Sequence, residues 1–268
     1  MRVTILGSGT SFGVPVIGCS CPVCLSDHPR NRHLRASAAV EIQGKVLLLD
    51  TGPDLREQAL RFSLDRVDAV LYTHAHADHI HGIDELRIFN LRHLHSIPCY
   101  ANSDTCSKLR SYFAYIFDEK EEEAGYPLLG KPHLTIHEVE GPFALLGVAV
   151  VPVPMLHGAR QVFGYRIGRF AYLTDVSRMP ESSMPLIQGL DLMVIDALRA
   201  RSHPTHFSID EALQVIGAAR PARAVLTHLS HQIDYETTNA SLPEGVELAY
   251  DGLVLEVVDP DKSKGVES

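Results

Sequence analysis

The residues best suited to chemistry lie in one stretch of the chain, Thr73-His74-Ala75-His76-Ala77-Asp78-His79-Ile80-His81-Gly82. Imidazole nitrogens bind zinc, iron and manganese, and a carboxylate adds the oxygen ligand that harder cations prefer. The alternative is a solvated histidine-rich loop, because such groups are destabilising when they are buried without partners. The stretch follows the apolar residues 67–72, whose length and valine content predict a buried strand. The sequence therefore predicts that this strand delivers metal ligands to a turn at the edge of a sheet.

Three later strands are also predicted to end in ligand-type side chains. His157 follows a strand expected at 148–153, Asp175 follows one at 170–173, and His228 follows one at 222–227. Read alone, each of the three is typical of an ordinary structural residue. Strand ends are, however, where an open sheet presents a site. The combined set exceeds the ligands of one tetrahedral ion and suits two ions: His74, His76, Asp78, His79, His157, Asp175 and His228.

Two further polar residues are placed to support such a centre. Asp50 ends the strand expected at 46–50 and can hydrogen-bond a ligating histidine, although it can also be a simple turn aspartate. His206 lies on a turn-rich segment just before a helix that Ser208 is predicted to cap, with Glu211 completing a capping box. His206 is either a group that faces the site or a surface histidine.

The spacing of Cys19, Cys21 and Cys24 lets three thiolates converge on one ion within the loop 18–25. Zinc prefers four ligands, so the fourth must come from elsewhere in the chain. The alternative is three buried thiols. His28 and His33, in the charged segment after this loop, are expected to be solvated.

Bulk properties limit the classes of function. The chain has 268 residues, 45% of them hydrophobic, and a formal net charge of −9. We expect one domain over 1–258 with a polar tail at 259–268, because no linker divides the chain. The acidic balance argues against a surface built to bind a nucleic-acid polymer. No run is long enough for a membrane helix, and the uneven cysteine count suits a reducing, cytoplasmic location. A homodimer is compatible with the sequence.

The remaining pattern predicts many strands and few helices. Helices are expected to begin near residues 53, 82, 104 and 208, and the helix over 104–117 has Leu109, Phe113 and Phe117 on one stripe. Cys99 and Cys106 are expected to be buried, inert thiols. The segment 118–132 carries Glu121-Glu122-Glu123 and is either a lid or a solvated acidic connection.

The His-x-His-x-Asp-His stretch resembles the metal signature of the metallo-β-lactamase superfamily. That resemblance implies an α/β fold (α+β in some schemes), a four-layer αβ/βα sandwich with two mixed β-sheets. It also implies that His74, His76 and His157 hold one divalent ion, that Asp78, His79 and His228 hold another, and that Asp175 bridges the two. Asp50 corresponds to an aspartate that supports a ligand in the family.

The cysteines together with His231 make the chain similar to the phosphodiesterase of the bacterial carbon–phosphorus lyase pathway and its relatives. In that group Cys19, Cys21, Cys24 and His231 would form a separate structural zinc site, and His206 would lie over the two-metal centre. The segment 118–132 does not clearly correspond to that group, which leaves the substrate preference open.

The expected function is a metal-dependent hydrolase, most simply a phosphodiesterase that cleaves small cyclic phosphate or nucleotide-type diesters by a hydroxide shared between the ions. Asp78 and His206 are the expected catalytic residues, with His206 as general acid. The active-site ions are zinc or manganese, with iron as a further candidate. Alternatives are a carboxylic ester, thioester or lactone hydrolase on the same site, and a non-catalytic accessory protein of cofactor biosynthesis. A tRNA-processing nuclease fits the acidic charge less well.

Overall fold

The computed structural model describes residues 1–117 and 130–257, so the expected lid segment and the polar tail lie almost entirely outside the described residues. Within these described ranges, fourteen strands form two sheets of seven. In spatial order the first sheet contains β14 (Val254–Glu256), β1 (Arg2–Gly7), β2 (Ser37–Ile42), β3 (Lys45–Leu49), β4 (Ala69–Leu71), β5 (Ile97–Ala101) and β6 (Leu134–Glu138). The second contains β13 (Val246–Leu248), β12 (Arg223–Thr227), β11 (Leu192–Asp196), β10 (Phe170–Leu173), β9 (Arg160–Ile167), β8 (Val148–His157) and β7 (Phe143–Leu145).

Both sheets are mixed. Strands β3 to β6 run parallel to one another, while β14, β1, β2 and β3 pair antiparallel. In the second sheet β10 to β13 are parallel, and β7 to β10 pair antiparallel. Parallel neighbours present their carboxyl ends at one edge of the sheet, which is where ligand-bearing turns can meet.

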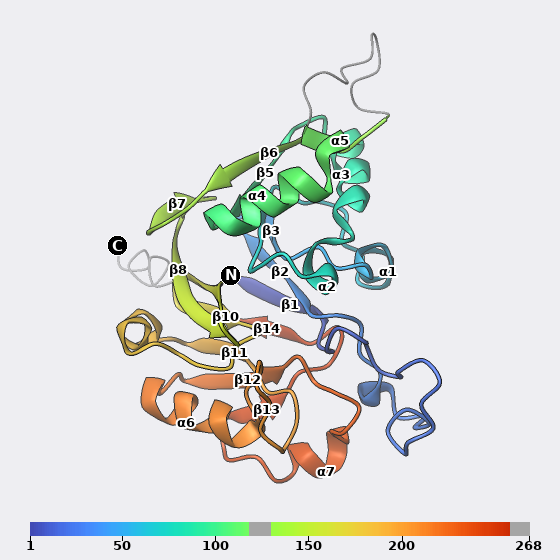
Figure 1. The fold of residues 1–268 in the computed structure, drawn as a ribbon, viewed down its shortest axis with the longest axis vertical. Helices are drawn as coiled ribbons and strands as arrows, with labels where there is room; N and C mark the ends of the chain where they lie inside the picture. Colours follow the sequence, from blue (N-terminus) through green and yellow to red (C-terminus); the bar gives the residue numbers. More distant parts are fainter. Residues whose placement is uncertain (118–129, 258–268) are drawn as a thin grey trace, which may run out of the picture.

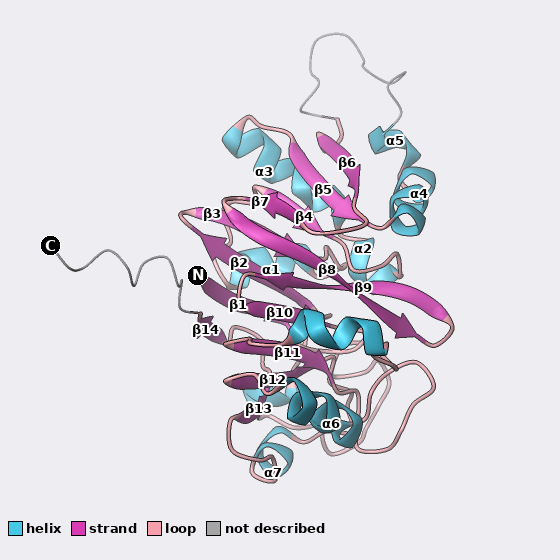
Figure 2. Ribbon diagram, turned by 90° about the vertical axis from the view of Figure 1, so that its left-hand side faces the viewer, coloured by secondary structure: helices cyan, strands magenta, loops and turns pink. Residues whose placement is uncertain are grey.

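Helices cover the outer faces of the two sheets. Figure 1 shows α1 (Leu55–Arg61), α2 (Ala77–Ile80), α3 (Leu86–His93), α4 (Ser103–Tyr112) and α5 (Ala114–Phe117) in the upper half of the molecule. It shows α6 (Ile209–Ala219) and α7 (Tyr235–Asn239) in the lower half, and Figure 2 shows the strands crossing the middle. Short 3-10 helices span Pro29–Asn31, Ile83–Glu85 and Glu181–Ile187.

The alternation of buried side chains explains the layers. Leu47 and Leu49 of β3 pack between the sheets against Tyr165 and Tyr172, whereas Leu48 packs outward under the helices of the first sheet. Side chains of a strand alternate between its two faces, so a strand that is apolar at every position must be covered on both. The four-layer αβ/βα sandwich with two mixed sheets is therefore confirmed.

Several boundaries differ from those expected. The helix predicted over 104–117 breaks at Phe113, whose φ of −118° and ψ of 43° are not helical. Strand β8 runs beyond the predicted 148–153 to His157. It passes through Pro152 and Pro154, which are tolerated because β7 pairs only with residues 148–150, and on that edge the next backbone bridge joins Leu156 to Arg178. No helix in the described part of the chain is long and apolar enough to cross a membrane.

Helix α6 begins as its sequence predicts. Ser208 is the N-cap, its hydroxyl accepts from the Glu211 N–H, and the Glu211 carboxylate accepts from the Ser208 N–H. This capping box satisfies two of the backbone donors that a helix start leaves unpaired. It also fixes the turn that carries His206.

Candidate metal centre

Close backbone packing holds the histidine-rich turn beside the end of β3. A side chain at Gly52 would place its Cβ 2.2 Å from the Asp78 carbonyl oxygen, and one at Gly82 would place it 2.1 Å from the Gly52 carbonyl. The Gly82 N–H donates to the Thr51 carbonyl, which ties the two turns together. Only glycine permits this approach, so the two turns form one rigid edge.

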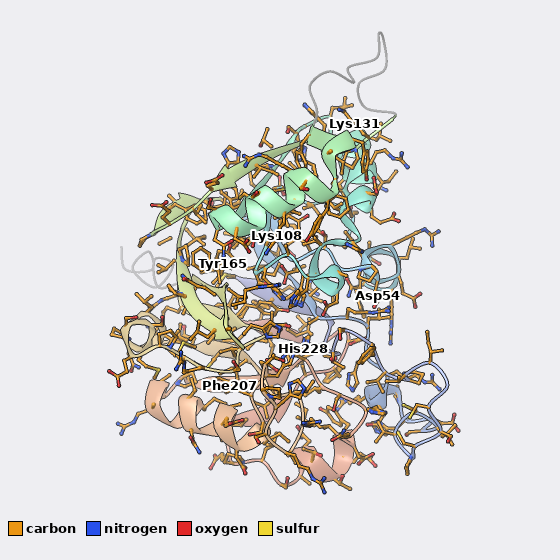
Figure 3. All side chains as sticks on the ribbon, viewed as in Figure 1. Asp54, Lys108, Lys131, Tyr165, Phe207 and His228 are labelled. Atoms are coloured by element: carbon orange, nitrogen blue, oxygen red, sulfur yellow. The ribbon has the colours of Figure 1, made fainter. Side chains whose placement is uncertain are left out.

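The later strand ends converge on this edge and bring the expected ligands together. Ligand atoms of His74, His76, His157 and Asp175 lie within 4.8 Å of one another, and so do those of His79, Asp175 and His228. Figure 3 shows His228 near the middle of the molecule, between the upper and lower halves that were described for Figure 1. The structure thus forms two groups that share one carboxylate.

The two oxygens of Asp175 face the two groups. Its Oδ2 lies 3.8 Å from His74 Nε2, while its Oδ1 lies 3.1 Å from His79 Nε2 and 3.3 Å from His228 Nδ1. Asp78 is not within the second group by the 4.8 Å measure, but its Oδ2 lies 3.2 Å from His79 Nε2. This is the geometry in which one carboxylate can serve two ions.

Three site residues adopt backbone conformations that are rare outside glycine. Asp50, Asp175 and His228 each follow the end of a strand, with φ of 62°, 57° and 60°. Aspartate and histidine enter this left-handed region more easily than most residues, but it remains sparsely populated. Such conformations concentrate at functional sites, because the surrounding structure must hold them in place.

Two buried nitrogens at the centre lie close to carboxylates without a hydrogen bond. His79 Nε2 and His228 Nδ1 are 3.1 Å and 3.3 Å from Asp175 Oδ1, but neither makes a hydrogen bond within the described residues. An unpaired buried nitrogen is destabilising unless something else satisfies it. A divalent cation between these nitrogens and Asp175 would do so, so the side chains present fit the metal that the signature implies.

The protonation states also suit metal binding. Burial lowers the pKa of His74 and His157, and it lowers the pKa of His228 to about 4, so these imidazoles are neutral. Burial opposes ionisation of Asp175, but its electrostatic interactions with His228 and His79 outweigh burial and hold its pKa well below the usual value. Metal ligands must be neutral imidazoles and ionised carboxylates.

His79 is the exception, and its surroundings explain why. Burial disfavours its charged form, but Asp175, Asp78 and Asp50 outweigh burial and raise its pKa well above the usual value. Here an imidazolium supplies the positive charge that these carboxylates need. A divalent cation in the same place would supply it instead.

Hydrogen bonds orient the histidine rings. His79 Nδ1 donates to Asp50 Oδ2 at 2.7 Å, and His157 Nδ1 donates to the Thr205 carbonyl at 2.6 Å. Asp50 also accepts from the N–H and the hydroxyl of Thr73. In both histidines the bond made by Nδ1 leaves Nε2 as the metal-binding nitrogen.

His206 lies over the centre. Its ring centroid is 4.7 Å from those of His157 and His228. Its Nδ1 lies 2.8 Å from Asp196 Oδ2 and 4.0 Å from Asp175 Oδ2. Burial would lower its pKa, but the hydrogen bond to Asp196 and the charge of Asp196 raise it to about 9.

Sequence reasoning did not single out Asp196, the partner of His206. Its side chain is fully buried, Oδ2 also accepts from the Val176 N–H, and Oδ1 has no partner within the described residues. The available signal was an aspartate at the end of an apolar strand, the same signal that identified Asp50. It was missed because the local sequence does not show that β11 lies between β10 and β12 in the sheet.

A second cluster joins the N-terminal loop to the turn after β12. His231 Nδ1 lies 3.2 Å from the Sγ of Cys19, 3.6 Å from that of Cys21 and 3.5 Å from that of Cys24. Ligands about 2.0–2.3 Å from a tetrahedral zinc are separated by roughly 3.5 Å, which matches these distances. The Cys24 N–H donates to Cys21 Sγ and lowers the pKa of that thiol to about 6, which favours the thiolate that zinc binds.

We predict that Cys21→Ser lowers the stability of the fold more than it alters any chemistry at the histidine-rich centre. A structural ion that binds only the folded state stabilises it, so its loss should lower the melting temperature by roughly 10 °C. Calorimetry and zinc analysis would measure this, with Cys106→Ser, a buried thiol of α4, as the control that should keep its zinc. Loss of zinc with an unchanged melting temperature would contradict the stabilising role.

The expectation that His33 is solvated is wrong. It is 3% exposed, and its Nδ1 lies 2.8 Å from the Ser8 hydroxyl, which donates to Asp251 Oδ1. The Leu34 N–H donates to the other oxygen of Asp251. This buried network pins the glycine-rich turn after β1. His28 remains partly exposed, as expected.

A hollow of about 760 Å³ lies elsewhere, between α1 and α3. Leu60, Ile88, Arg56 and Arg92 are among its lining residues. None of the candidate metal ligands lines it, so we do not assign it to the reaction.

Comparisons with known proteins place these features in a family. A family model described as the beta-lactamase superfamily domain matches residues 45–229. A solved structure of a diphosphatase from the PhnP family is 42% identical, with a TM-score of 0.88, over 96% of this chain and 98% of that chain.

Two curated relatives are also similar. The octanoyltransferase of Porphyromonas gingivalis is 36% identical over 258 residues, covering 94% of this chain but 51% of that protein, so the chain spans about half of its length. The coenzyme PQQ synthesis protein B of Methylobacterium nodulans is 26% identical over 229 residues, covering 73% of this chain and 72% of that protein.

Proposed function

This chain belongs to the PhnP family of the beta-lactamase superfamily, and we propose on that premise that it is a metal-dependent hydrolase of small phosphoric diesters. The observation that carries the proposal is the 42% identity with a diphosphatase over nearly all of both chains. In a diester and in the diphosphate of a dinucleotide, the reacting phosphorus carries two bridging and two non-bridging oxygens. One centre can therefore attack either, and we include both in the proposed substrate class.

We propose that the first group, His74, His76 and His157, and the second, Asp78, His79 and His228, each hold one divalent ion, with Asp175 shared. When bound, such ions act as Lewis acids toward phosphoryl oxygens and lower the pKa of water. Zinc, manganese and iron all suit this donor set, since affinity order alone does not decide loading. A third ion, structural zinc, would occupy the Cys19, Cys21, Cys24 and His231 site.

The protein's own groups then orient the reaction. Asp50 holds the His79 ring, and the Thr205 carbonyl holds the His157 ring, so both rings are fixed before substrate arrives. His206 is bonded to Asp196 through Nδ1, which leaves its Nε2 to donate a proton to the leaving-group oxygen. Asp196 is a positioning residue that holds the His206 ring and favours its protonated form.

A substrate panel with metal analysis tests the proposal. We expect bis(nitrophenyl) phosphate to be hydrolysed with a higher kcat/KM than a nitrophenyl carboxylic ester, an acyl thioester or a lactone. Chelation should remove the activity, and adding zinc or manganese should restore it. We expect three ions in each fully loaded chain.

Each alternative predicts a different outcome of this panel. Preference for the thioester or lactone would favour a carboxylic ester, thioester or lactone hydrolase, because the same ions with different pocket walls serve either chemistry. A fully loaded protein that turns over none of them would favour a non-catalytic role.

A further inference from the structure

Arg160 occupies a defined place at the mouth of the centre. It begins β9 and is paired in register with His157, the last residue of β8, across a two-residue turn. Gly158 opens the turn with a φ of 62°, which such tight hairpins require. Residues directly opposite one another on paired strands point to the same face of the sheet. The Arg160 side chain therefore emerges on the same face as the His157 imidazole.

The guanidinium reaches the candidate ligands. Arg160 Nη1 lies 2.7 Å from His76 Nε2. A guanidinium only donates, so His76 Nε2 accepts this hydrogen bond. Within the described residues Arg160 makes no other hydrogen bond or ion pair, and its side chain is exposed.

Metal binding and this hydrogen bond exclude each other. A neutral imidazole has one acceptor nitrogen and one N–H. If His76 binds an ion through Nε2, that acceptor is occupied. If it binds through Nδ1, Nε2 carries the proton and becomes a donor. In either case Arg160 would lose its partner when the centre is loaded, and its N–H groups would be available to another acceptor beside His76.

The chemistry of arginine indicates which acceptor would take the place of His76 as the hydrogen-bond partner of Arg160. A guanidinium can donate two parallel hydrogen bonds to two oxygens of one phosphate. It therefore recognises a phosphate group by its planar geometry as well as by its charge. If the scissile phosphate binds at the ions, a guanidinium that extends from the β8–β9 hairpin beside His76 is placed to contact a second phosphate joined to it. We propose that Arg160 anchors the phosphate next to the scissile one and so selects diphosphate diesters over simple diesters. This inference rests on the proposed function.

Two substrates that share a nucleoside test it. Diadenosine diphosphate carries the second phosphate, and adenosine nitrophenyl phosphate does not. Arg160→Ala should lower kcat/KM for the diphosphate by about 10- to 100-fold, mainly through KM, which is the size expected for hydrogen bonds to a charged group. The simple diester should change less than about threefold. Arg160→Lys should recover only part of the loss, because lysine restores the positive charge but cannot donate two parallel hydrogen bonds to one phosphate.

Binding supplies a second readout that does not depend on turnover. Calorimetry should show that Arg160→Ala weakens the methylene analogue of adenosine diphosphate by about tenfold and adenosine monophosphate by much less. Arg56→Ala removes the same charge from an exposed arginine of α1 and should change neither affinity.

The outcomes separate the two proposals. Equal losses for both substrates, or no loss for either, in an otherwise active enzyme would overturn the anchoring role and leave the phosphodiesterase intact. Failure of the wild-type protein to hydrolyse either compound would overturn the proposed function and the anchor with it.

Discussion

Asp175→Ala is expected to abolish metal loading of the active centre and hydrolysis together, with turnover reduced by about 10⁴-fold or more. The reason is that one carboxylate faces both groups, with Oδ2 toward His74 and Oδ1 toward His79 and His228. In the proposed centre its removal would take a ligand from two ions at once and leave His79 with less negative charge around it. Metal analysis and turnover of bis(nitrophenyl) phosphate would measure both effects.

Suitable controls distinguish metal loss from misfolding. Asp191→Ala removes the same side chain just before β11, where the carboxylate pairs with Arg169 at the surface, and should keep both the ions and the activity. The structural zinc should stay in Asp175→Ala, because the cysteine site has its own ligands. An Asp175→Ala protein that still binds two ions at the active centre would refute the shared-ligand arrangement.

His206→Ala should leave the ions in place but reduce turnover by about 10²–10⁴-fold, the usual scale of general acid–base catalysis. The ring lies over His157 and His228 without belonging to either ligand group, and Asp196 holds its Nδ1. The loss should be largest for a substrate with an alkoxide leaving group. It should be smaller for nitrophenolate, which leaves without protonation.

Three comparisons sharpen this experiment. Asp196→Asn should give a smaller loss with the same dependence on leaving group, because it removes the charge that favours protonated His206 but keeps the imidazole. His137→Ala, an exposed histidine of β6, should have no effect. If His206→Ala lowers turnover by the same factor for substrates with good and with poor leaving groups, His206 positions the substrate and does not donate a proton.

Local pattern was enough for the elements and for part of the site. The alternation of Leu47, Leu48 and Leu49 requires cover on both faces of a strand, and the structure supplies it from the other sheet and from helices. The pair Ser208 and Glu211 marks the start of α6 because a capping box acts within four residues. The histidines of the turn after β4 are neighbours in the chain, so their proximity needed no knowledge of the fold.

Tertiary structure alone decided how the remote groups meet. The order of strands β10, β11 and β12 places Asp175, Asp196 and His228 at one edge, and it is this order that turns Asp196 into the partner of His206. The burial of His33 and the contact of Arg160 with His76 were equally hidden in the sequence. The physical reason is that periodicity and capping report contacts within a few residues, whereas strand order is set by packing two whole sheets against each other.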